Sequence, residues 1–198
     1  FDTKLEHTAE DVAKYPSVMD QADMRHQAIK DFMASKNIPL EEVDIVMARG
    51  GLIVPVITGV YNVNQDMREV LKSCRDGKHA CNLSAILADD VAAEINQIRE
   101  EKHLTPRFGK CVAYIADPPM ADEMLPECRM GGIPEFTRKT LFHALNSRAI
   151  VRRYLREHGH KTNDVTAIVA HMGGGATISL HRNGKVIDTN HGLGGDGP

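Results

Sequence analysis

The stretch His171-Met172-Gly173-Gly174-Gly175-Ala176-Thr177 decides the fold predicted for this chain, because its three glycines join two apolar runs. The run before it, residues 165–170, is predicted to be a buried strand. Two more strands are predicted at 178–182 and 185–189, with an Asn-Gly pair between them. Since Asn-Gly between two alternating runs is the strongest short-range hairpin signal, we predict strand, glycine turn, strand, tight turn and strand.

The glycines Gly173, Gly174 and Gly175 favour a phosphate-binding turn. Without side chains they let the backbone approach a ligand closely, and several N–H groups can point at one anion. His171 comes directly after the predicted strand, so its ring would face whatever the turn holds. The alternative is that the turn is only a tight connection between two strands.

The composition indicates a globular protein and argues against several classes of function. Hydrophobic residues make up 42% of the 198, which is enough for a core. A net charge of −3 and the absence of Trp argue against nucleic acid as a partner. Four arginines at helical spacing are expected to form a solvated helix face: Arg148, Arg152, Arg153 and Arg156. No apolar run approaches the length of about 18 residues that a membrane-spanning helix needs. No signal-peptide pattern is present. Four cysteines without a CxxC pair are typical of reduced thiols, so we expect a cytoplasmic protein with no membrane partner.

Helices are predicted to alternate with strands along the rest of the chain, which favours an α/β domain with a mixed sheet flanked by helices. Asn82 is expected to cap the longest helix, whose stripe of apolar residues begins at Leu83. The helices are predicted at 18–35, 64–73, 82–98 and 134–154. The additional strands are predicted at 43–48, which is expected to be buried, and at 111–116. A loop with Pro55, Thr58 and Gly59 is expected to lead into the helix at 64–73.

Ionisable residues follow the predicted strands and lie next to glycine or proline. Arg49 precedes Gly50-Gly51, Asp117 precedes Pro118-Pro119, and His171 precedes the three glycines. Because ligands of such sheets bind at the carboxyl ends of the strands, these side chains are candidates for one active site.

Each candidate also has a simpler interpretation. Arg49 suits a carboxylate or phosphate as a rigid two-pronged donor, or forms a surface salt bridge. Asp117 orients a nucleophile or holds Mg²⁺, or only begins a turn. His79 lies before a helix N-terminus, a natural anion site, or has no chemical role. His143, within a predicted amphipathic helix, is expected to be structural.

One further glycine pattern is discounted. Residues 192–197 match the GxGxxG spacing of dinucleotide sites, but the chain ends at Pro198, where a helix should follow.

The motifs around these residues resemble those of the acetate and butyrate kinases, the acetokinase branch of the sugar kinase/Hsp70/actin superfold. The resemblance extends over essentially the whole chain and is closer to the butyrate kinases. It implies a ribonuclease H-like domain of the actin-like ATPase superfold. The residues that carry it are Ala48–Leu52, Lys78–Leu83, Phe142–Asn146, Ile168–Gly175 and His181–Asp188.

The resemblance implies reversible transfer of a phosphoryl group from ATP, with Mg²⁺, to butyrate or a branched short-chain acid. By position, Arg49 would bind the carboxylate or the transferring group, and His79 would help to hold the site. His171 would stabilise the phosphoryl group, and Asp117 would orient the carboxylate or act through Mg²⁺. No residue is assigned as a direct metal ligand. A carboxylate nucleophile is already ionised at neutral pH, so no strong general base is required.

Small residues beside the catalytic candidates suggest how a longer acyl chain is accepted. Gly51 follows Arg49 and Ala170 precedes His171, and the resemblance implies bulkier neighbours in acetate kinases. We therefore expect Gly51 and Ala170 to contact the substrate. An acetate or propionate kinase remains an alternative, as does a non-catalytic binding domain of the same fold.

The resemblance also implies that residues 1–198 form the acyl-binding N-terminal kinase domain, truncated at both ends. The family's first phosphate-loop hairpin and its C-terminal adenosine-binding domain would lie outside this chain. We therefore expect these 198 residues alone to be inactive, and the full-length protein to be a homo-oligomer.

Overall fold

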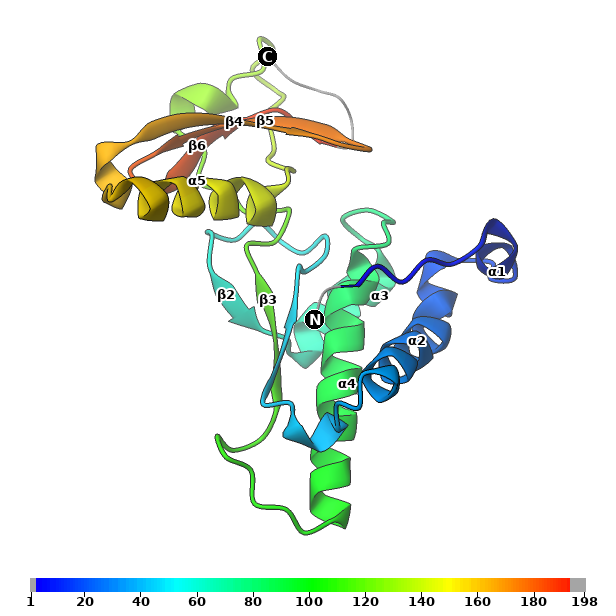
Figure 1. The fold of residues 1–198 in the computed structure, drawn as a ribbon. Coiled ribbons are helices and arrows are strands. Elements are labelled where there is room, and N and C mark those ends of the chain that lie inside the picture. The colour runs from blue at the N-terminus through cyan, green and yellow to red at the C-terminus, as the bar shows by residue number, and fades with distance from the viewer. Residues whose placement is uncertain (1–2, 193–198) are drawn as a thin grey trace. The chain divides into compact units, whose positions relative to one another are not determined.

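The computed structural model describes residues 3–192, and the chain divides into two compact units. One unit contains residues up to Leu52 together with Tyr61–Ile115, and the other contains Ile53–Val60 together with the residues from Ala116 onward. Each unit has a three-stranded sheet and at least one long helix (Figure 1). This arrangement confirms the predicted α/β class.

The first unit is organised around the helix α4, Asn82–Glu101, and a sheet of order β1-β3-β2. Strands β1 and β3 are parallel, with Ile45 opposite Val112. The strand β2 lies in a segment that was predicted to be a loop. The other elements, in chain order with the strands, are α1 (Ala9–Ala13), η1 (Val18–Gln21), α2 (Ala22–Ser35), η2 (Leu40–Glu42), β1 (Ile45–Ala48), β2 (Val60–Asn62), α3 (Gln65–Ser73) and β3 (Val112–Ala116).

The apolar stripe predicted for α4 forms the core of this unit. Leu83, Ile86 and Ile95 are among its buried residues, and α4 packs against both α2 and β1. Buried Arg99, near the end of α4, donates to the carbonyl oxygens of Glu41 and Val43, which ties the segment before β1 to the helix.

The prediction that the strand at 43–48 is buried was wrong. Ile45 and Met47 are 56% and 54% exposed. Successive strand residues point to opposite faces, and only one face of β1 is covered by described residues.

The second unit contains an antiparallel sheet of order β4-β5-β6. Met172 pairs with Ala176 across the three glycines, and Arg182 pairs with Lys185. Asn183 and Gly184 have φ values of 53° and 76°, which confirms the predicted tight turn. The elements are η3 (Pro126–Arg129), α5 (Ala144–His158), η4 (Thr162–Asp164), β4 (Thr166–Met172), β5 (Ala176–Arg182) and β6 (Lys185–Thr189).

The helix α5 covers one face of this sheet (Figure 1). A core cluster of Ala121, Phe142, Ala144 and Val186 includes a residue from α5 and one from β6. On the other face, Ile168 and Met172 are 74% and 75% exposed, so the prediction of a buried strand holds for one face only. The apolar run forms the strand, but only its alternate residues are covered.

The prediction of a helix over residues 134–154 was wrong for its first ten residues. The helix begins at Ala144 and ends at His158, and it is followed by the C-cap residue Gly159, which has a φ of 68°. Before it, Phe142 N–H donates to the Pro119 carbonyl, and the Leu141 carbonyl accepts from Gly192 N–H. Because other segments bind these backbone groups, residues before 144 cannot use them to form helical turns.

A buried polar row on β5 includes Thr177, Ser179 and His181. The ring Nε2 of His181 lies 2.9 Å from Ser179 Oγ. Burial lowers the pKa of His181 to about 4; the charge of Arg148 acts in the same direction, and that of Glu123 opposes it.

We expect this histidine to make the protein less stable as the pH falls from about 6.5 to 4. Over that range His181 binds a proton in the unfolded chain but not in the folded chain. The free energy of unfolding therefore rises with pH by at most about 1.4 kcal/mol per pH unit. Urea unfolding between pH 4.5 and 7.5 measures the slope. His181→Gln should flatten it relative to the unchanged protein, and equal slopes would contradict the assignment.

Candidate functional site

In the first unit, the loop after β1 is bound to the start of α4. Ser84 Oγ donates to the Gly50 carbonyl at 2.7 Å, and Leu52 N–H donates to Asn82 Oδ1 at 2.9 Å. Asn82 Nδ2 in turn donates to the Gly77 carbonyl at 2.9 Å. Asn82 is fully buried and is the first residue of the helix, so the prediction that it caps the helix was wrong. Instead it joins the two loops that carry Arg49 and His79.

His79 is held in one orientation beside the same helix end. Its ring Nδ1 accepts from Cys81 N–H at 3.1 Å. With Nδ1 as the acceptor, the neutral ring carries its proton on Nε2. His79 is exposed, so this Nε2–H is a donor on the surface.

Arg49 lies close enough to this helix end for its charge to act on Cys81. Burial raises the pKa of the Cys81 thiol, and the Arg49 guanidinium opposes that rise. Arg49 is exposed, and none of the carboxylates in residues 3–192 forms an ion pair with it. The first turn of α4 contains no acidic residue. The structure therefore places Arg49 and His79 at one helix N-terminus, where donors and positive charge suit an anion.

The absence of a side chain at Gly51 has a packing reason. A Cβ built there would lie 2.6 Å from Leu71 Cδ2 and 2.8 Å from Asn82 Cα. The loop could not lie this close to α4 with a larger residue. Contact between Gly51 and an acyl chain stays a prediction.

In the second unit, two histidine rings are stacked beside the glycine turn. The ring centroids of His143 and His171 are 3.7 Å apart, and the rings are inclined by 6°. His171 Nδ1 lies 2.9 Å from Asn146 Nδ2, and His143 Nδ1 lies 2.9 Å from Thr177 Oγ1. With the Asn146 amide as donor, His171 carries its proton on Nε2.

The His171 ring lies beside Gly173 and the His143 ring beside Gly175, whereas Gly174 has no ring nearby. A Cβ on Gly173 would be 3.4 Å from His171 Nε2, and one on Gly175 would be 3.6 Å from His143 Cε1. None of the three glycines has a positive φ, and Gly173 N–H donates to the Gly175 carbonyl. The two Cβ distances are ordinary van der Waals contacts, so neither the two rings nor the backbone conformation requires glycine at these positions. The helix α5 begins directly after His143, so the positive end of its dipole adds to this cluster.

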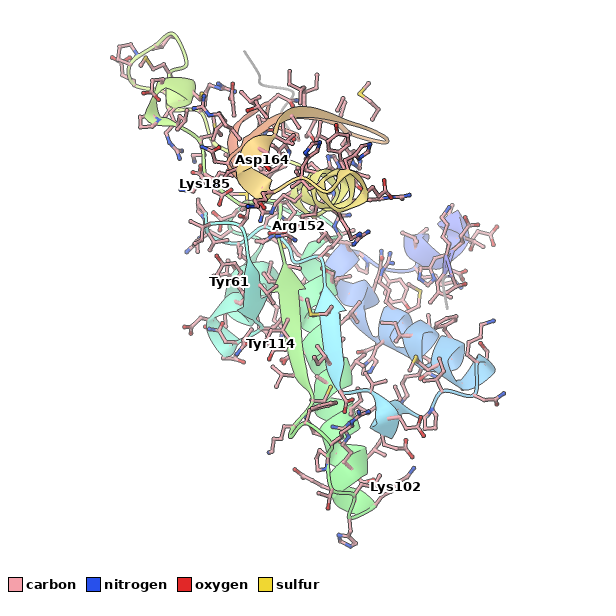
Figure 2. The ribbon with its side chains drawn as sticks, turned by 60° about the vertical axis from the view of Figure 1, so that its left-hand side comes forward. Tyr61, Lys102, Tyr114, Arg152, Asp164 and Lys185 are labelled. Carbon is pink, nitrogen blue, oxygen red and sulfur yellow. The ribbon has the colours of Figure 1, made fainter. Side chains whose placement is uncertain are left out.

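Asp117 follows β3 and lies buried in the second unit, with a φ of 41°. Its Oδ2 lies 3.1 Å from Arg148 Nε and 3.5 Å from Arg152 Nη1. Both arginines project from α5, and Figure 2 labels Arg152 there. Asp117 Oδ1 is buried without a hydrogen-bond partner among the described residues.

The predicted site residues are thus divided between the units. Arg49, Gly51 and His79 lie in the first, while Asp117, Ala170, His171 and Gly173–Gly175 lie in the second. Ala170 and His171 are consecutive on β4 and point to opposite faces, and Ala170 is exposed on the face away from α5.

Sequence reasoning missed three residues of the second unit: His143, Asn146 and Arg148. A signal for the first two existed, because Phe142–Asn146 was among the motifs of the family resemblance. For Arg148 the helical spacing suggested only a solvated face. Its side chain is instead 12% exposed.

Other features add no reacting group to these two clusters. An apolar hollow of about 490 Å³ lies over Pro126–Thr137, but its Arg129 is paired with Asp122. Within residues 3–192, no three His, Cys, Asp or Glu side chains form a group that could hold a metal ion. Over the same residues, no helix has the length and hydropathy of a membrane span.

Comparison with known proteins identifies related sequences and folds. Residues 134–195 match the model of the acetokinase family. The chain is 40% identical to butyrate kinase 1 of Clostridium acetobutylicum over 198 residues, which are all of this chain and 52% of that protein. It is 39% identical to butyrate kinase 2 of the same organism over 193 residues, 98% of this chain and 50% of that protein. The chain therefore spans about half the length of the curated relatives it matches.

A solved structure shares the fold. Acetate kinase of Porphyromonas gingivalis superimposes with a TM-score of 0.57 and 18% identity, covering 84% of this chain and 42% of that one. Together with the sequence matches, this finding confirms the predicted resemblance.

Proposed function

Because this chain carries an acetokinase-family domain at residues 134–195, we propose that the full-length protein is a carboxylate kinase. It would transfer a phosphoryl group reversibly from ATP to butyrate or a branched short-chain acid. The observation that carries the proposal is the stacked pair of His143 and His171 against the glycine turn. The identity to two butyrate kinases supports the choice of acid.

Phosphoryl transfer needs positioning and neutralisation of charge more than covalent chemistry. We assign Arg49 and the Nε2–H of His79 to binding an anionic group of the substrates, with the carboxylate as the first candidate. His171 Nε2–H, the His143 ring and Gly173–Gly175 are assigned to the transferring phosphoryl group, whose negative charge they would stabilise.

One property of Asp117 suits it to hold the metal ion that accompanies ATP. Its Oδ1 is a buried carboxylate oxygen with no partner among the described residues, and Mg²⁺ prefers such oxygens. We propose that Asp117 holds the hydrated Mg²⁺, which neutralises phosphate charge when bound. Arg148 and Arg152 would limit Asp117 to that single oxygen, since both contact Oδ2.

The domain boundaries predicted from the sequence become part of this proposal. Residues 1–198 would supply the acyl-binding part of the kinase, and we expect them to be inactive alone. The match to about half of each relative supports this division. A cytoplasmic location is supported by the four free cysteines, and the homo-oligomeric state stays a prediction.

Trapping of acyl phosphate as the hydroxamate tests the function in the full-length protein. With acids of two to five carbons, we expect the highest kcat/KM for butyrate or a branched four- or five-carbon acid. A preference for acetate or propionate would favour the alternative kinase. Absence of product with every acid would overturn the proposal and favour a non-catalytic binding domain.

A further inference from the structure

Asp117 has an unusual combination of conformation and environment. Its φ of 41° is rare for a residue other than glycine and costs about 1–3 kcal/mol. The backbone N–H is fixed by the Gly59 carbonyl at 2.8 Å, and the residue is 3% exposed. A buried carboxylate needs a compensating charge, and a strained backbone persists only where its surroundings hold it.

Arg148 supplies that charge from a fixed position. Its Nη1 donates to the Gly184 carbonyl at 2.8 Å, in the turn between β5 and β6. Its Nε lies 3.1 Å from Asp117 Oδ2 without the alignment of a hydrogen bond, so the contact is an ion pair. The hairpin turn therefore determines where the guanidinium lies relative to Asp117.

A second carboxylate near Arg148 is already satisfied by other donors. Glu123 accepts from Thr58 Oγ1 at 2.8 Å and from Val186 N–H at 3.0 Å. Its Oε2 is 3.8 Å from Arg148 Nη1, farther than the contact with Asp117. Of the two carboxylates, only Asp117 retains a buried oxygen without a hydrogen-bond partner among residues 3–192.

We propose that Arg148 is the positioning residue for Asp117. It neutralises the buried carboxylate, holds Oδ2 and leaves Oδ1 as the acceptor for a cation or a hydrogen-bond donor of the substrates. Arg152 Nη1 donates a hydrogen bond to the same oxygen at 3.5 Å, but its side chain is 62% exposed, so water screens its charge. The kinetic consequence of this inference rests on the proposed kinase function.

Kinetics of the full-length protein separate positioning from simple stabilisation. We expect Arg148→Gln to lower kcat about 10²-fold, the loss typical of a misplaced group, with KM for the acid changed less than about threefold. Arg148→Lys should recover part of the loss, because it restores the charge. Arg152→Gln should have a much smaller effect. Arg153→Gln is the matched control on α5, since Arg153 pairs with exposed Glu157, and its kcat should be unchanged.

A double substitution tests whether Arg148 acts through Asp117. If it does, Arg148→Gln should have little further effect on kcat once Asp117→Asn is present. If the double variant lost kcat by the product of the two single losses, the proposal would be overturned. An unchanged kcat in folded Arg148→Gln would overturn it as well. If Arg148→Gln does not fold, Arg148→Lys is compared in the same cycle.

The unsubstituted protein, the two single variants and the double variant also provide a readout that needs no activity. In urea unfolding, the midpoint shifts of Arg148→Gln and Asp117→Asn should not add, because each removes one partner of a buried pair. Additive shifts would overturn the pairing. Inactivity of the unsubstituted protein toward every acid would overturn the proposed function instead, and the unfolding cycle would still decide the pairing.

Discussion

Replacing His143 by alanine should lower kcat of the full-length protein by about 10²–10³, the usual cost of removing one donor from a site of developing charge. The ring lies on Gly175 and is stacked on His171, whose own orientation is fixed by Asn146. Removing it takes away one charge-stabilising group and also the surface that holds the other ring in place. His171→Ala should therefore cause a loss of similar size.

Steady-state kinetics with a saturating acid and ATP measure this effect. His158→Ala is the matched control, because His158 lies on the same helix and is exposed, with its ring stacked on Tyr154. The control should retain its kcat. A fully active His143→Ala protein would show that the stacked pair has only a structural role. In that case the glycine turn would lose its assignment to the phosphoryl group.

Asn82→Leu should lower the free energy of unfolding by about 2–6 kcal/mol, since each buried backbone group left without a partner costs about 1–3 kcal/mol. Leucine has the same branched arrangement of side-chain heavy atoms but replaces none of the hydrogen bonds of Asn82. Leu52 N–H and the Gly77 carbonyl would both lose their partner. Because Asn82 joins the loops of Arg49 and His79, we also expect weaker binding of anions by these two residues.

Urea unfolding at neutral pH measures the stability change. Asn64→Ala is the control: Asn64 caps α3 by accepting from Met67 N–H at an exposed site, so its loss should cost about 1 kcal/mol. Equal destabilisation by the two substitutions would contradict the role of Asn82 as the buried link between two loops.

Much of the fold could be predicted because its signals are local. The helix over 64–73, the stripe of α4 and the Asn183-Gly184 turn each depend on residues that are neighbours in the sequence. The same is true of the strands on either side of the three glycines. Errors arose where distant partners decide, as at 134–143, whose backbone groups bind Pro119 and Gly192 instead of forming a helix.

The candidate site divides in the same way. The sequence alone predicts Arg49, Asp117, His171 and the glycines as candidates, because strand ends beside glycine or proline are common ligand sites. Periodicity could not reveal that His143 stacks on His171, since the contact joins the start of α5 to the end of β4. Nor could it reveal the ion pair of Arg148 with Asp117, which a residue on a different element, Gly184, helps to hold.

For this protein, then, the sequence by itself determined the class of fold, the strands on either side of the glycine turn and the resemblance to a family. Backbone propensities and short motifs act over a few residues, and they are readable without a partner. Only the tertiary structure decided which face of each strand is covered, which histidine joins His171 and which arginine neutralises Asp117. Those outcomes depend on contacts between residues far apart in the chain, and burial makes each of them energetically decisive.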